Sequence, residues 1–333
     1  MTKLVGWTNS RSRKPSIVAR RKAVTAVDVA TMQTRHIEKT PMVSESDFYA
    51  GLSGFELNTD EYDLGHGVLL RKTYVHLMRP MMLAFKEPAS PGMHHPSPWI
   101  PSSAGDAIDM RVELVIPNGY ANRGLDRMTI AKTVVTLLRI FVNPEISLMF
   151  ASDHALSSFP DLDRKGIPLK GSTLDILPRQ FALGLVEPMS MDDLDLVKMH
   201  WSTAVALRSS SPEFAFAMEV MELGQFIPST AMTLVSIWGA LEAIFSPSAG
   251  ELRFRVSALI ATYMEPLGEG RLASQKEIAK LYDLRSAAAH GKPKHRGDDL
   301  LASFHLLRMV LIKIMEDKKL PSKDDLERML FFG

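Results

Sequence analysis

The distribution of proline is the sequence feature that most constrains what this chain can fold into. Fourteen of its 20 prolines lie at or before residue 188, and the other six are spread over residues 189–333. Proline lacks a backbone N–H and has a fixed φ, so it interrupts helices and is excluded from central strands. The first part should therefore consist of short elements between turns, whereas the second part has room for long helices.

Short apolar runs between turn signals dominate the chain up to residue 188. Their β-branched and aromatic content predicts strands at Val68–Leu77, Met110–Ile116, Ile146–Phe150 and Phe181–Val186. A single helix is expected at Arg127–Phe141, before Asn143-Pro144, and the five prolines of residues 88–103 predict a loop. This part is expected to fold as α+β.

Helical periodicity and helix-end signals replace the strand patterns after residue 189. Acidic residues or proline open most of the expected helices. These helices are residues 190–207, 212–223, 229–245, 251–264, 274–290 and 298–318, with a short helix after Pro321. The second part is therefore expected to be an all-α helical bundle.

The formal net charge of +1 hides an uneven distribution of charge along the chain. Residues 1–39 hold nine Lys or Arg against two acids, which makes this segment +7 and leaves −6 on the remainder. Such a segment suits contact with nucleic acid, although a solvated tail has the same composition. We expect three regions: a basic, flexible arm at 1–39, an α+β sensing or regulatory domain at 40–188, and a helical domain at 189–333.

The composition excludes several classes of site. Without cysteine the chain has no disulfide, no Cys-ligated zinc and no Cys nucleophile, and it is compatible with a reducing cytoplasm. It contains no run of about 18 apolar residues that would span a membrane. No P-loop or dinucleotide fingerprint indicates a nucleotide cofactor. We expect a cytoplasmic protein with no cofactor, no metal site and no membrane contact.

The most informative segment is Leu281-Tyr-Asp-Leu-Arg-Ser-Ala-Ala-Ala-His-Gly291, at the end of an expected helix. At ~100° per residue, Arg285 falls on the apolar stripe of this helix, where a guanidinium needs a partner or a task. Asp283 and His290 share another face, and the glycine that follows is placed to cap the helix. One interpretation is structural: Arg285 pairs with Glu242 on a neighbouring apolar helix, and His290 bonds terminal carbonyls.

Three blocks of the helical part together resemble the ApeA-like HEPN (higher eukaryotes and prokaryotes nucleotide-binding) domain. They are Ile237-Trp-Gly-Ala-Leu-Glu-Ala-Ile-Phe-Ser-Pro247, Glu251-Leu-Arg-Phe-Arg-Val-Ser257 and the segment that ends at Gly291. The resemblance covers roughly residues 190–320. It implies a metal-independent endoribonuclease that forms a homodimer, in which an arginine and a histidine of each protomer meet in one cleft. It also implies a role in prokaryotic antiviral defence or a toxin-like role.

On this resemblance, Arg285 and His290 match the catalytic positions. His290 would take the proton of the RNA 2′-OH or protonate the leaving 5′-oxygen, and Arg285 would hold the phosphate. Ser286 stands where the family usually has Asn, Asp or His. The expected supporting or RNA-binding residues are Glu242, Asp283, Ser286, Lys292, Lys294 and Arg296, of which the last three form an acid-free basic loop.

Two other interpretations stay open at the level of sequence. In one, the domain is a non-catalytic HEPN module that binds RNA or a nucleotide or only dimerises, which Ser286 favours. In the other, the chain is a DNA-binding regulator that uses residues 1–39. The expected partners are RNA, a second copy of this chain and an unknown trigger for the N-terminal domain.

Overall fold

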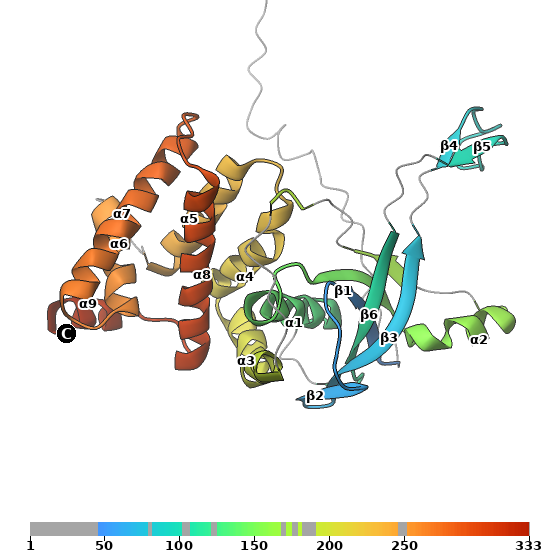
Figure 1. Ribbon diagram of the computed structural model, residues 1–333, viewed down its shortest axis with the longest axis horizontal. Helices are drawn as coiled ribbons and strands as arrows, with labels where there is room; N and C mark the ends of the chain where they lie inside the picture. The colour runs from blue at the N-terminus through green and yellow to red at the C-terminus, as the bar shows by residue number, and fades with distance from the viewer. Residues whose placement is uncertain are drawn as a thin grey trace, which may run out of the picture. The chain divides into compact units, whose positions relative to one another are not determined.

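The computed structural model describes residues 46–78, 82–101, 107–120, 125–167, 171–174, 179–181, 191–245 and 252–332. The basic segment 1–39, most of the expected strand at 181–186 and the expected helix start at residue 190 lie outside the described residues. Residues Ser44–Gly333 form one compact unit. In it an antiparallel sheet is followed along the chain by helices (Figure 1). The expected order of an α+β part and an all-α part is confirmed.

Six strands of the described residues form one antiparallel sheet in the order β2-β3-β6-β1-β7-β8. Their bounds are β1 Phe48–Ser53, β2 Glu61–Gly65, β3 Val68–Met78, β6 Ala107–Ile116, β7 Ser147–Ser152 and β8 Gly171–Thr173. The expected strands within β3, β6 and β7 are confirmed. In the β3–β6 pairing, Lys72 lies opposite Val112 but Val75 lies opposite Met110. One extra residue of β3 therefore bulges from the ladder.

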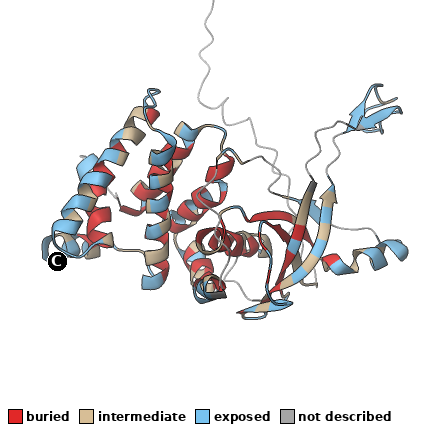
Figure 2. Ribbon diagram, in the orientation of Figure 1, coloured by how far each residue is buried: buried red, intermediate tan, exposed pale blue. Residues whose placement is uncertain are grey.

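A separate two-stranded ribbon is formed by β4 (Met82–Ala84) and β5 (Trp99–Pro101). The expectation of a loop throughout residues 88–103 is therefore wrong at β5. A proline is tolerated there because a two-stranded ribbon consists only of edges, where a ladder N–H can be missing. Figure 2 shows the ribbon exposed along its length.

Helix α1 (Arg127–Phe141) has the bounds that the sequence predicts, and it packs between the sheet and the helical part. It begins where the Asp126 carboxylate accepts a hydrogen bond from the Thr129 amide at 2.7 Å. It contacts β6 and β7 on one side and α3 (Met191–Ser210) and α4 (Pro212–Leu223) on the other. Because both sides are covered, ten of its 15 residues are buried (Figure 2).

The other helices are α2 Phe159–Arg164, α5 Thr230–Phe245, α6 Leu252–Met264, α7 Glu269–Ala289, α8 Gly297–Asp317 and α9 Lys323–Phe332, with short 3₁₀ turns η1 Leu156–Ser158 and η2 Gly224–Phe226. From α3 to α8 the expected ends are confirmed to within three residues, except that α7 begins five residues early. It starts after Gly268, whose φ of +149° turns the chain. No helix among the described residues is long and apolar enough to cross a membrane.

The sheet and the helices share one hydrophobic core. Most of their buried apolar residues form a single cluster, and buried hydrogen bonds cross between the two parts. The Trp201 indole of α3 donates to the carbonyl of Leu64 in β2 at 2.7 Å. The Arg139 guanidinium of α1 donates to the carbonyl of Glu222 in α4 at 3.0 Å. The change from strand patterns to helical periodicity near residue 188 is thus a change of secondary structure within one packed unit.

Candidate active site at the end of helix α7

A glycine cap ends helix α7 and positions His290. Gly291 has a φ of +70°, a conformation that residues with a Cβ rarely adopt. The Lys292 amide donates to the Ala287 carbonyl at 2.9 Å, and the Gly291 amide donates to the Ala288 carbonyl at 3.1 Å. This is a Schellman motif, and it confirms the expected cap. His290 is the last residue before the chain turns, and it is exposed to solvent.

Arg285 lies further inside α7 and pairs with α5. Its Nη2 donates to Oε2 of Glu242 at 3.0 Å, and the two side chains are only 21% and 20% exposed. The ion pair that the apolar stripe of α7 suggests is therefore confirmed. Such a pair in a poorly solvated place stabilises the helix contact only while both partners are present.

Two aromatic rings form the apolar surroundings of this ion pair. The Arg285 guanidinium lies 5.5 Å from the centroid of the Tyr282 ring, and Tyr282 meets Trp238 of α5 edge to face, with centroids 5.2 Å apart. Burial and the neighbouring Glu242 carboxylate raise the pKa of Tyr282 to about 12. The phenol therefore stays protonated at physiological pH. Tyr282 and Trp238 are core residues.

The hydrogen-bonding capacity of the ion pair is only partly used. Among the described residues, five buried side-chain atoms have no hydrogen-bond partner, and three of them are Arg285 Nε, Glu242 Oε1 and Trp238 Nε1. Nearly all buried polar atoms in folded proteins are paired, so each exception needs an explanation. These three unpaired atoms lie on the facing helices α5 and α7, so the contact between the two helices has hydrogen-bonding capacity left for another polar group.

The basic loop of residues 291–296 leads from α7 to α8. His295 anchors it to α5, with Nε2 at 3.1 Å from the Thr230 hydroxyl. Lys292, Lys294 and Arg296 are exposed, and no ion pair engages their side chains within the described part of the chain. Three exposed basic side chains beside the end of α7 can contact a phosphate backbone, although Asp298 and Asp299 follow them in the first turn of α8.

Two of the expected supporting residues lie apart from the Arg285 pair. Asp283 accepts hydrogen bonds from Nε and Nη2 of Arg253 in α6, at 2.6 and 2.9 Å, with both side chains more than half exposed. Ser286 is half-buried, and its carbonyl accepts the His290 amide at 3.2 Å. The sequence pattern does not reveal that Arg253 holds α6 against α7, because its partner is 30 residues away along the chain.

Within one protomer, Arg285 and His290 point in different directions. Five residues at ~100° and ~1.5 Å each place their side chains about 140° apart around the helix and about 7.5 Å apart along it. Arg285 faces α5, whereas His290 lies at the exposed end of α7.

The chain matches no protein-family model, no curated protein and no solved structure. The chemistry open to the site follows from its own residues.

Proposed function

We propose that the chain is a metal-independent endoribonuclease of the HEPN type that acts as a homodimer. The observation that carries the proposal is the under-hydrogen-bonded ion pair between Arg285 of α7 and Glu242 of α5, together with the capped end of α7, which exposes His290. The resemblance of residues 190–320 to ApeA-like HEPN domains supplies the reaction. The basic loop after His290 supports it, because an RNA substrate brings a phosphate at every nucleotide.

The reaction uses groups that RNA and this cluster supply. The RNA 2′-oxygen attacks the adjacent phosphorus, the bond from phosphorus to the 5′-oxygen breaks, and a 2′,3′-cyclic phosphate remains. An imidazole such as that of His290 can accept the 2′ proton or deliver one to the 5′-oxygen near neutral pH. The Arg285 guanidinium has N–H donors beyond the one bonded to Glu242, and these stabilise the charge that builds on the phosphate.

A dimer completes the site in this proposal. The α7 ends of the two copies face each other. One copy then supplies Arg285 and the other supplies His290 to the same phosphate. Glu242 orients Arg285, while Lys292, Lys294 and Arg296 hold the RNA backbone on either side. From the same resemblance we assign the protein to antiviral defence or a toxin-like role, with the sheet part receiving an unidentified trigger.

A non-catalytic module is the second candidate. The divergent directions of Arg285 and His290 within one protomer favour it, and so does Ser286, which cannot carry a charge. Such a module binds RNA or a nucleotide through the basic loop and dimerises without turnover.

The test is cleavage of a labelled single-stranded RNA by the purified full chain in EDTA, with the products analysed for a 2′,3′-cyclic phosphate. We expect His290→Ala and Arg285→Ala to abolish cleavage. The matched controls His305→Ala and Arg328→Ala change exposed residues of α8 and α9 and should cleave at the wild-type rate. A substrate with 2′-deoxyribose at the cleaved position should be resistant.

Three outcomes would contradict the proposal. Cleavage that survives His290→Ala rules out the assigned acid or base. RNA binding without turnover under every condition supports the module instead. A protein that sediments as a monomer while cleaving RNA rules out the composite site.

A further inference from the structure

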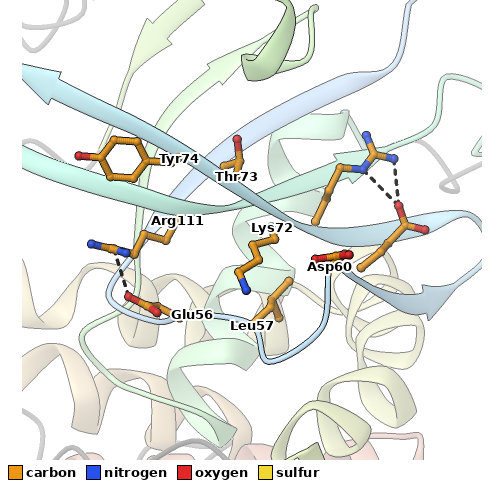
Figure 3. Close-up of a pocket in the computed structure, with 9 residues that line it drawn as sticks. Glu56, Leu57, Asp60, Lys72, Thr73, Tyr74 and Arg111 are labelled. Atoms are coloured by element: carbon orange, nitrogen blue, oxygen red, sulfur yellow. Dashed lines mark hydrogen bonds and ion pairs between the residues drawn. The ribbon is translucent and has the colours of Figure 1, made fainter.

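A cavity of about 690 Å³ lies at the sheet, on residues that the proposed function does not use. This volume falls within the range of about 300–1,000 Å³ that is typical of small-molecule sites. Its wall comes from the segment between β1 and β2, the start of β2, the middle of β3 and one residue of β6 (Figure 3). The lining residues are Glu56, Leu57, Asp60, Glu61, Arg71, Lys72, Thr73, Tyr74 and Arg111.

The bulge of β3 explains why these side chains meet. The register shifts between Lys72 and Val75, so Thr73 and Tyr74 both lie opposite the single residue Arg111 of β6. A bulge re-aims the side chains around it, and bulges are frequent beside binding sites. The Lys72 amide donates to the Asp60 carbonyl at 2.8 Å, which fixes the segment before β2 against β3.

Two of the cavity's three cations are already neutralised. Arg71 lies 3.1 Å from Glu61. Arg111 lies 3.1 Å from Glu56. Among the described residues no ion pair engages Lys72 or Asp60, and these two are not close enough to pair with each other. Figure 3 shows the Lys72 side chain extended toward the segment that carries Glu56 and Leu57, with Asp60 further along this segment. The cavity therefore offers one unpaired positive and one unpaired negative charge.

An aromatic face borders these charges. Tyr74 is 62% exposed, although the Arg111 guanidinium lies over its ring, 5.6 Å from the centroid. An exposed ring of this kind offers an apolar surface for a flat or apolar ligand group.

We propose that this cavity binds a short peptide with free termini. The peptide carboxylate binds Lys72, its ammonium group binds Asp60, and an aromatic side chain packs on Tyr74. A charge-balanced pair of contacts matches a zwitterion, because each end of the ligand neutralises one unpaired group. A nucleotide fits less well, because its phosphates meet Glu56, Asp60 and Glu61 with only one unpaired cation available.

Calorimetric titration of the full chain with three probes tests the inference. The probes are the dipeptide phenylalanylglycine, its N-acetylated form, which lacks the cation, and its C-terminal amide, which lacks the anion. We expect the free dipeptide to bind about tenfold more tightly than either blocked form, the effect of losing one charge-assisted hydrogen bond.

Each of two variants should abolish one of these two differences in affinity. In Lys72→Met the free dipeptide and its amide should bind equally, and in Asp60→Asn the free dipeptide and its acetylated form should bind equally. Lys86→Met changes an exposed lysine outside the cavity and should bind as the wild type does. Thermal unfolding of each variant shows that the fold is kept.

The inference is overturned if the dipeptide gives no heat at its highest soluble concentration, or if all three probes bind alike. It is also overturned if adenosine monophosphate binds more tightly than the dipeptide and competes with it. Because the cavity and the α7 end share no residue, RNA cleavage by Lys72→Met should equal that of the wild type. The two proposals can therefore fail separately.

Discussion

Arg285 of α7 donates one hydrogen bond to Glu242 of α5 at 3.0 Å, while Arg285 Nε and Glu242 Oε1 stay without a partner among the described residues. The contact between these two helices thus rests on an ion pair that is only partly satisfied. Its contribution to stability depends on both partners being present, because removal of one leaves the other charge poorly solvated.

We expect Arg285→Met and Glu242→Met each to lower the free energy of unfolding by about 1–3 kcal/mol, because each leaves the other charge without its partner. This range is reduced for partial solvent access. The double variant Arg285→Met with Glu242→Met should lie within about 1 kcal/mol of the wild type, because neither charge is then left alone. Urea unfolding measures all three. A double variant as unstable as the sum of the single ones would mean that the two residues do not interact.

Gly291→Ala should lower the free energy of unfolding by about 1 kcal/mol, because the φ of +70° is strained for a residue with a Cβ. No atom lies within 4 Å of the position of the new Cβ, so a clash contributes nothing. Gly291→Asn should cost less, since asparagine tolerates this conformation. Urea unfolding of both variants checks the prediction, and equal losses would count against the assigned cap.

Glu113 of β6 is 1% exposed and accepts a hydrogen bond from the Leu156 amide at 2.7 Å. We expect Glu113→Leu to lower the free energy of unfolding by about 1–3 kcal/mol, because that amide then has no acceptor. Glu113→Gln keeps an acceptor and should be tolerated.

The same residue gives a pH dependence with a definite sign. Burial raises the pKa of Glu113 above its ordinary 4.5. A carboxyl group whose pKa is higher in the folded than in the unfolded state stabilises the fold at a pH below its unfolded-state pKa. This stabilisation is lost as the pH rises through the folded-state pKa. Relative to Glu113→Gln, the wild type should therefore become less stable as the pH rises from 4.5. A constant difference between the two proteins across this range would contradict the assignment.

His200 of α3 should make the fold sensitive to acid. Its ring stacks on Phe141 with centroids 5.6 Å apart, and burial lowers its pKa below the ordinary 6.5. Glu316 opposes this shift and Lys318 adds to it. A histidine whose pKa is lower in the folded state stabilises the fold at a pH above 6.5. This stabilisation is lost as the pH falls through the folded-state pKa of His200. Thermal unfolding between neutral and mildly acidic pH should show a smaller loss in His200→Gln than in the wild type.

The helices could be predicted from the sequence because their signals are local. Asp126 before α1, Pro212 at the start of α4 and Gly291 after α7 each act within one turn of the residues they cap. The sequence predicts too late a start for α7 because Gly270 lies inside its first turn, where glycine costs about 1 kcal/mol relative to alanine. Packing of α7 against α6 outweighs that local preference.

Strands β1, β2 and β8 could not be predicted in this way, because their stability comes from partners far along the chain. Strand β1 is only six residues long and pairs with β6 on one side and β7 on the other. Its Gly51 resembles a turn signal, yet a Cβ there would lie 2.5 Å from the Met110 sulfur. The glycine therefore allows close packing within the sheet.

The candidate site was predicted in part for the same reason. The apolar stripe of α7 indicates that Arg285 is buried and needs a partner, and Glu242 is a candidate because it lies on an equally apolar helix, α5. The contact of Arg253 with Asp283 and that of His295 with Thr230 join residues 30 and 65 positions apart. No periodic pattern in the sequence predicts either contact, and none predicts the cavity at the bulge of β3.

The enclosure of α1 between the sheet and helices α3 and α4 has a consequence for how the chain can be divided. A truncation that begins at residue 189 would keep Arg285 and His290 but would strip α3 and α4 of the surface they fold against. The excised sheet would in turn expose one side of α1 to water. The span Ser44–Gly333 should therefore melt as one cooperative unit, and a proteolytic cut near residue 188 should not release a stable helical fragment.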